Sequence, residues 1–161
     1  MKILDIQVMR GPNYWSIRRT ELIVVRLDLE EMENKPSHKI HGFFERLNKL
    51  LPGMYNHRCS VGKPGGFFQR VQSGTWMGHI VEHVALEIQT LAGMDCGFGR
   101  TRETAYKGIY NIVFTYTEEK VGIYAARAAV RIVSALIKGV KYKLEKDIQK
   151  MKEIRESERL G

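Results

Sequence analysis

Apolar and polar positions alternate near the start of the chain, as they do in a strand with one buried face. Residues 3–8 follow this period of two, and residues 21–29 form a β-branched run with a charged flank, so both segments are predicted as strands. The intervening Gly-Pro-Asn-Tyr-Trp at 11–15 has the composition of a turn. A third strand is predicted over residues 109–116, which alternate in the same way.

Other segments place apolar residues at the three- and four-residue spacing of a helix. They are residues 42–51, which Pro52-Gly53 terminates, residues 75–92 and the long segment 117–138. Two early strands and one later strand among helices lack the regular alternation of βαβ units. We therefore expect an α+β fold in which a small mixed or antiparallel sheet packs against helices.

The segment 141–161 is dominated by charge but keeps a narrow apolar stripe. Leu144, Ile148 and Met151 form this stripe at helical spacing, which predicts a charged C-terminal helix. This helix either lies on the surface with one weak seam or docks on a neighbour outside the chain. We divide the chain into a domain over residues 1–140 and a charged helical tail or linker over residues 141–161.

The composition fits one folded domain without a membrane anchor. The chain has 161 residues, of which 43% are hydrophobic, enough for an ordinary core. No apolar stretch approaches the roughly 20 residues that span a bilayer, and residues 1–11 lack the apolar segment and cleavage site of a secretory signal. Two cysteines, Cys59 and Cys96, are too few for a disulfide framework. We expect a cytoplasmic protein with free or metal-bound thiols.

The net charge of +8 by itself suggests nucleic acid or an anionic membrane as partner. Residues 141–161 contribute seven basic and five acidic side chains, so the remaining +6 lies in residues 1–140. There it forms short arginine clusters and no run of five or six like charges. Because arginine pairs with carboxylates as well as phosphates, these clusters predict an anionic ligand of either kind. The clusters are Arg18-Arg19, Arg58, Arg100 with Arg102, and Arg127 with Arg131.

The segment 79–83 reads His-Ile-Val-Glu-His, the pattern H-x-x-E-H. On a helix, His79 and His83 are one turn apart and can share one divalent metal ion, and Glu82 lies beside them. In that position its carboxylate can act as general base toward a metal-bound water. Two histidines on a helix are also common as hydrogen-bonded core or surface groups, so the residues around them must decide between these interpretations.

Helical geometry divides this predicted helix into two sides. Its aliphatic residues form one broad apolar side, which we expect to pack on the core. His79, Glu82, His83 and Glu87 gather on the other side, together with Trp76. A simply solvated face would not carry a tryptophan. A cleft lined by these groups, with a metal site in it, is therefore the better account.

A catalytic zinc site needs three protein ligands and an open position. Cys59 is the first candidate for the third ligand, because a thiolate suits zinc and its loop precedes the helix. Glu87, Glu118 and Glu119 are the carboxylate alternatives. Cys59 could equally be an inert thiol, and Cys96, which has no companion ligand nearby, is predicted to be a core residue.

The glycine-rich segments do not predict a nucleotide site. Residues 97–102 contain Gly-Phe-Gly-Arg but lack the third glycine and the following helix of a dinucleotide loop. Residues 62–66 have the wrong spacing for a phosphate-binding loop. Arg100 and Arg102 are either a carboxylate clamp near the cleft or part of a solvated loop.

Several long strings of this sequence occur together and in order in one known family. They resemble the N-terminal domain of cyanophycin synthetases, and the likeness covers about residues 1–140. The strings are residues 10–19 (RGPNYWSIRR), 26–30, 65–67, 74–79 and 91–102.

The resemblance implies a place in the synthesis of a polypeptide. The family makes cyanophycin, a poly-aspartate backbone with arginine joined to each side-chain carboxylate, using an ATP-grasp domain and a Mur-ligase-like domain that follow the N-terminal domain. This chain stops before either, so we expect no ATP site in it. The expected partners are the cyanophycin polymer and those two domains, with a homo-oligomer also possible.

The resemblance further implies that the domain holds the polymer and, in members that keep H-x-x-E-H, cuts it into shorter primers. His79 and His83 would then bind zinc, with Cys59 as third ligand, and Glu82 would activate water. The motif is similar in form to that of zinc peptidases with an inverted H-x-x-E-H, which is an analogy of site and not of fold. The alternative is a non-catalytic anchoring and assembly domain in which the histidines only hydrogen-bond.

The expected polymer also changes the interpretation of the charge. Cyanophycin presents guanidinium groups together with carboxylates, so its binding surface should be mixed, with Arg100, Arg102 and Glu87 among the contacts. Nucleic acid would favour a basic stripe interleaved with aromatic residues, which the sequence does not show. We expect neither a nucleic acid nor a membrane as partner.

Overall fold

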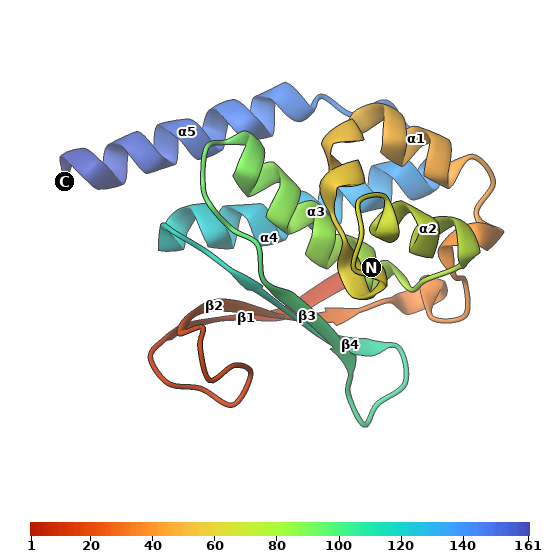
Figure 1. The fold of residues 1–161 in the computed structure, drawn as a ribbon, viewed down its shortest axis with the longest axis horizontal. Coiled ribbons are helices and arrows are strands. Elements are labelled where there is room, and N and C mark those ends of the chain that lie inside the picture. Colours follow the sequence, from red (N-terminus) through yellow and green to blue (C-terminus); the bar gives the residue numbers. More distant parts are fainter.

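Four antiparallel strands form one sheet in the order β1-β2-β4-β3. In the computed structural model, which describes residues 1–161, helices cover one face of this sheet (Figure 1). The predicted α+β fold, with its sheet antiparallel, is therefore confirmed. The strands are β1 (Lys2–Arg10), β2 (Glu21–Asp28), β3 (Gly99–Glu103) and β4 (Ile109–Thr115).

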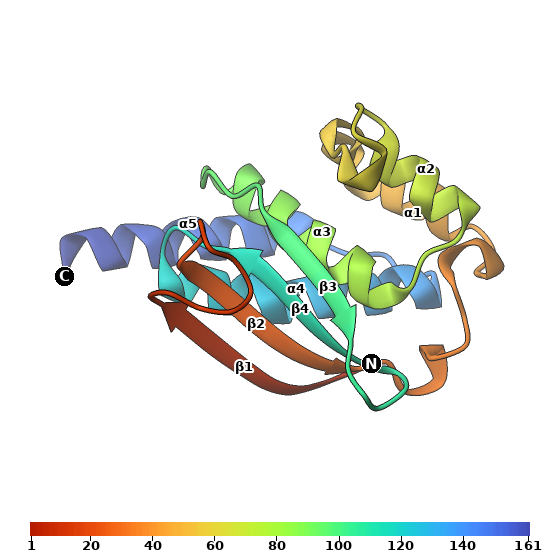
Figure 2. The same ribbon diagram turned by 60° about the horizontal axis from the view of Figure 1, so that its bottom comes forward.

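The central position of β2 explains its unbroken apolar run. This strand pairs with β1 on one side and β4 on the other, and both of its faces are covered. Val25 and Leu27 belong to the main core beneath the helices and are fully buried. Leu22 and Val24 lie on the opposite face, where Trp15 packs on them. Figure 2 shows the segment between β1 and β2 crossing that face of the sheet.

Two long helices, α3 (Met77–Leu91) and α4 (Glu119–Lys138), pack on the sheet and against each other. The close approach of α4 depends on Gly122, which has no side chain. A Cβ there would lie 2.7 Å from Cβ of Tyr116 and 3.0 Å from Cγ1 of Ile23, closer than packed carbons tolerate. No helix of the structure is both long and apolar enough to cross a membrane.

Two short helices, α1 (Phe43–Leu50) and α2 (Gly66–Ser73), form a corner beside one end of α3 (Figure 2). Their contact includes the rings of Phe44 and Phe68, whose centroids are 5.4 Å apart in an edge-to-face arrangement. Leu47 of α1 is fully buried in the main core. This corner places the loops that follow α1 opposite the polar side of α3.

The sequence prediction missed β3 and α2. The residues of β3, expected in a glycine-rich loop, are Gly-Arg-Thr-Arg-Glu, and no apolar residue marks them as a strand. These residues form a strand because they pair with β4. Helix α2 was taken as part of the loop before α3, although Phe67, Phe68 and Val71 have helical spacing and are buried.

The C-terminal helix α5 (Leu144–Leu160) confirms the predicted charged helix. Its apolar stripe packs within the chain, on α4 and α3, and Met151 is fully buried. Of the two alternatives, docking on a neighbour outside the chain was therefore wrong for this stripe. The role of residues 141–161 as a linker toward a further domain stays a prediction.

A buried carboxylate fixes α5 to α4. Asp147 accepts hydrogen bonds from the hydroxyls of Tyr124 (2.7 Å) and Tyr142 (2.6 Å) and from the guanidinium of Arg131 (2.9 Å). Burial alone would raise the pKa of this carboxyl, but the hydrogen bonds and the charge of Arg131 outweigh it and lower the pKa below its ordinary 3.8. The ionised form therefore stabilises the folded state.

We expect Asp147→Asn to lower the free energy of unfolding by roughly 1.5–3 kcal/mol at pH 7, because it removes charge-assisted hydrogen bonds from a buried acceptor. The contribution of Asp147 is fully present above pH ~4 and is lost as the pH falls through its lowered pKa. Urea unfolding at pH 7 and at pH 3 measures both effects. The difference between variant and wild type should shrink at pH 3, whereas Glu156→Gln, an exposed change on α5, should be neutral at both.

Candidate metal centre

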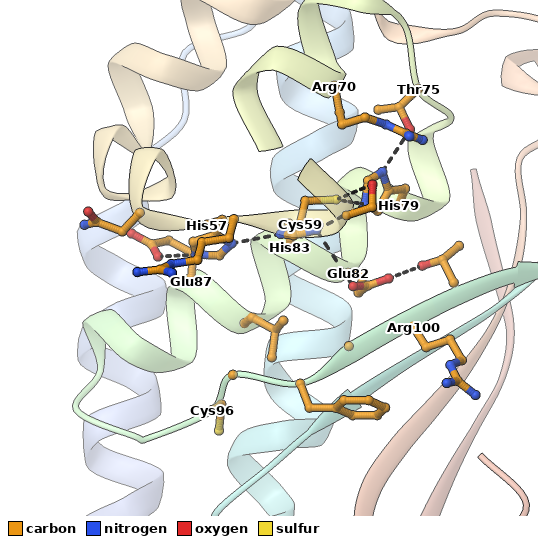
Figure 3. Close-up of a pocket in the computed structure, with 18 of the residues that line it drawn as sticks. His57, Cys59, Arg70, Thr75, His79, Glu82, His83, Glu87, Cys96 and Arg100 are labelled. Atoms are coloured by element: carbon orange, nitrogen blue, oxygen red, sulfur yellow. Dashed lines mark hydrogen bonds and ion pairs between the residues drawn. The ribbon is translucent and has the colours of Figure 1, made fainter. Parts of the chain in front are cut away.

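The polar side of α3 lines a cavity of about 1080 Å³. Other lining residues come from the 3-10 turns Pro52–Asn56 and Cys59–Val61, which follow α1, and from the start of β3. Trp76 also lines it. The cleft predicted from the two-sided pattern of α3 is therefore present (Figure 3).

Three side chains in this cavity converge on one point. The Nε2 atoms of His79 and His83 are 3.1 Å apart, and Sγ of Cys59 is 3.2 Å from Nε2 of His79. All three potential ligand atoms lie within 4.8 Å of one another. Two nitrogens bound to a tetrahedral zinc ion lie ~3.3 Å apart, and a sulfur and a nitrogen ~3.6 Å apart. The two contacts made by His79 are close to these separations, and all three atoms lie near enough to one another to bind a single zinc ion.

Helix α3 supplies two of these atoms, and the segment between α1 and α2 supplies the third. His79 and His83 are one turn apart on α3, whereas Cys59 has a φ of 52°, a left-handed conformation that side-chain-bearing residues rarely adopt. Its segment is held against the start of α2: the N–H of Phe67 donates to the carbonyl oxygen of His57 at 3.1 Å. A Cβ at position 66 would collide with the carbonyl of Arg58, so this approach requires a glycine.

Both helical histidines are held in their neutral form. Burial lowers the pKa of His79 to about 4, with a smaller effect from the charge of Arg70. Burial also lowers the pKa of His83 well below its ordinary value, assisted by His79 and His57. Neutral imidazole is the form that binds a metal ion.

Glu82 is buried beside the cluster. One of its carboxylate oxygens lies 3.9 Å from Nε2 of His83, and the other accepts a hydrogen bond from the hydroxyl of Thr101 at 2.5 Å. Burial raises the pKa of Glu82 to about 7, an effect that the Thr101 hydrogen bond reduces. The carboxyl can therefore both hold and release a proton near neutral pH.

The carboxylates considered as alternative third ligands lie elsewhere. Oε2 of Glu87 is 2.9 Å from Nε2 of His57. Glu118 accepts from Arg155 at 3.3 Å, and Glu119 pairs with Arg10 at the surface. Of the four candidates, the structure brings only Cys59 to the two histidines.

Cys96 is buried, as predicted for a core residue. Its thiol lies 3.6 Å from Oε1 of Gln89 and 3.5 Å from the hydroxyl of Thr117. Burial raises the pKa of this thiol. It therefore stays protonated and takes no part in the cluster of Cys59.

The structure does not bring Arg100 and Arg102 to the cluster. Thr101 reaches Glu82 from the helix-covered face of the sheet, and neighbouring residues of a strand point to opposite faces. Accordingly, the guanidinium of Arg100 donates to the carbonyl of Trp15 on the far face at 3.1 Å, although Arg100 also borders the cavity (Figure 3). Arg102 is exposed and is not among the lining residues.

Two other arginines line the cavity instead. Arg58 precedes Cys59, and Arg70 is on α2 close enough to His79 to lower its pKa. Arg58 was noted in the sequence only as a basic residue, and Arg70 was missed because α2 was not predicted. Its position next to the candidate ligand Cys59 was the one feature of the sequence that could have placed Arg58 at the site.

Fold and site together define a small α+β domain with a Cys-His-His cluster in a cavity between a helix and a loop corner. The comparisons with known proteins agree with the resemblance seen in the sequence. A family model described as the cyanophycin synthase-like N-terminal domain matches residues 24–138. The chain belongs to this family.

Relatives with curated descriptions carry the name cyanophycin synthetase. Those of Synechocystis sp., Geminocystis herdmanii and Trichormus variabilis are 54%, 55% and 56% identical to this chain over 164 aligned residues that cover all of it. The chain spans 18–19% of the length of these relatives.

Two glycines beside the site, Gly97 and Gly99, should differ in their tolerance of a larger side chain. A Cβ at Gly99 would collide with the carboxylate of Glu82, whereas nothing lies within 4 Å of a Cβ at Gly97. We expect Gly99→Ala to lower the free energy of unfolding by about 1–3 kcal/mol, the usual cost of overpacking. Gly97→Ala, the matched control, should change it by less than about 0.5 kcal/mol. Urea unfolding of both variants checks this, and equal effects would contradict the placement of Glu82.

Proposed function

We propose that this domain is a zinc-dependent hydrolase that cuts the peptide backbone of cyanophycin into shorter chains. The observation that carries the proposal is the convergence of Cys59, His79 and His83 beside the buried carboxyl of Glu82. We infer the polymer substrate from the name of the relatives, cyanophycin synthetase. We also infer that the chain serves an ATP-dependent ligase that polymerises aspartate and arginine.

Cys59, His79 and His83 would hold the ion through one sulfur and two nitrogens. A zinc ion bound there would lower the pKa of its water toward ~7 and polarise the scissile carbonyl. Glu82 would take a proton from the attacking water and pass it to the leaving amine. Thr101 holds one oxygen of this carboxyl at 2.5 Å, which leaves the other for the proton transfer.

The cavity offers positive charge for a carboxylate-rich substrate. Arg58 and Arg70 line it and are exposed, so their guanidinium groups can pair with the carboxylates of the polymer. We assign the contacts at the site of cutting to them in place of Arg100 and Arg102. Glu87, which is bound to His57, is not assigned a substrate contact.

Removal of the proton acceptor should separate metal binding from hydrolysis. We expect Glu82→Gln to retain one equivalent of zinc and to lose chain cutting by at least ~100-fold, the usual contribution of a general base. Elemental analysis and sizing of the polymer after incubation measure the two properties. Glu45→Gln, on an exposed position of α1, should cut normally. Unchanged cutting by Glu82→Gln would overturn the proposal.

A second candidate function, polymer anchoring, is supported by the other face of the sheet. The strand registers place Asp5, Arg26, Asn111 and Arg102 side by side in one row across all four strands. Residues opposite each other in antiparallel strands share a face, so this row combines a carboxylate, an amide and two guanidinium groups. Such a mixed surface suits a polymer that carries both charges.

The anchoring candidate makes its own prediction. Replacing Arg26 and Arg102 together by alanine should weaken retention of the domain on insoluble cyanophycin by about tenfold or more, since charge-assisted hydrogen bonds contribute roughly 1.5–3 kcal/mol each. A sedimentation assay measures this retention. Glu82→Gln should be retained as well as wild type. Undiminished retention of the double arginine variant would exclude this face as the anchor.

A further inference from the structure

A buried hydrogen-bonded chain runs from Glu87 through His57 to His83. Nε2 of His57 lies 2.9 Å from Oε2 of Glu87, and Nδ1 of His57 lies 2.9 Å from Nδ1 of His83. The side chains of Glu87, His57 and His83 are only 6%, 16% and 8% exposed. Neither zinc binding nor hydrolysis, as derived above, uses His57 or Glu87.

The chemistry of this chain fixes where its protons lie. A carboxylate only accepts hydrogen bonds, so Nε2 of His57 carries the proton that is donated to Glu87. When His57 carries only this proton, its Nδ1 is a bare acceptor. Its contact with Nδ1 of His83 requires that the latter nitrogen carry a proton. His83 therefore presents an unprotonated Nε2, and this is the nitrogen that lies 3.1 Å from His79.

The other histidine of the cluster lacks such control. Nδ1 of His79 contacts the hydroxyl of Thr75 at 2.9 Å, and a hydroxyl can donate or accept. The threonine hydroxyl therefore does not set the tautomer of His79 as the carboxylate does for His83; without zinc, the bare Nε2 of His83 at 3.1 Å requires the proton of His79 to lie on Nε2.

Packing keeps the members of the chain in place. The ring of Phe67 stacks on that of His83, with centroids 4.0 Å apart and planes 22° from parallel. Glu87 fits only because position 53 is a glycine, where a Cβ would collide with its carboxylate. The ring plane of His83 and the end of the chain at Glu87 are therefore both set by neighbouring residues.

We propose that His57 and Glu87 are positioning residues that hold His83 in the tautomer and orientation required for metal binding. This inference rests on the proposed zinc site and extends it to the groups behind the ligands. Partners of this kind orient a ligating imidazole and raise its basicity, and their loss typically weakens metal affinity 10–100-fold.

The test uses the 161-residue chain and zinc alone as probe. His57→Phe keeps a planar ring but removes the acceptor, and we expect it to bind zinc roughly 10–100-fold more weakly in competition with a chromophoric chelator. His41→Phe, at an exposed position, is the matched control and should bind like wild type. Affinity of His57→Phe equal to wild type would overturn the inference.

A second readout needs no metal. In the zinc-free wild type, ¹⁵N chemical shifts should show His83 protonated at Nδ1 and bare at Nε2. In Glu87→Gln, whose amide can also donate, the population should shift toward the other tautomer. An Nε2-protonated His83 in the wild type would refute the chain as described.

The two readouts keep the inference separate from the proposed function. If wild type binds no zinc but His83 has the expected tautomer, the zinc hydrolase proposal fails and the hydrogen-bonded chain stands. If wild type binds zinc and cuts the polymer while His57→Phe and Glu87→Gln change neither affinity nor tautomer, the inference fails and the hydrolase stands. Thermal unfolding in the presence of chelator identifies a variant that has merely lost its fold, and the other variant then carries the test.

Discussion

Loss of water around the polar side of α3 is the constraint on which the rest of the site depends. This one helix packs against the sheet and α4, yet it carries His79, Glu82, His83 and Glu87 into a cavity where they are largely buried. Groups removed from water need partners or a neutral state. The partners come from other segments: a thiol and an imidazole from the corner, a hydroxyl from β3. The pKa values of both histidines fall and that of Glu82 rises for the same reason.

Features of the site that depend on residues close together in the sequence could be predicted, whereas those that depend on contacts between distant segments could not. The H-x-x-E-H spacing and the two-sided pattern of α3 are local, and both predicted the cavity correctly. The direction of Arg100 depends on strand parity in β3, and the place of Arg70 depends on α2. Neither element was predicted: β3 forms through its pairing with β4, and the helical spacing within α2 was taken as part of a loop. His57 was assigned no role from the sequence, since its bonds to Glu87 and His83 span 30 and 26 positions.

The sheet separates the two proposed activities. Thr101 faces the helices and touches Glu82, while Arg100 and Arg102, one residue to either side, belong to the opposite face. Cutting and anchoring would therefore use alternate side chains of the same short strand. A polymer held on one face need not block the cavity on the other, and substitutions on the two faces can be combined without disturbing each other's contacts.

The contact between Cys59 and His79 joins positions 20 residues apart, and the segment between them includes all of α2. It thus closes a loop around that helix, and the hydrogen bond from the N–H of Phe67 to the carbonyl oxygen of His57 ties this loop to the residues just before it. Closing a loop links the order of everything within it. The cluster and the α2 corner should therefore open as one cooperative unit, with amide hydrogens of α2 exchanging through the same opening that separates the sulfur from the imidazole.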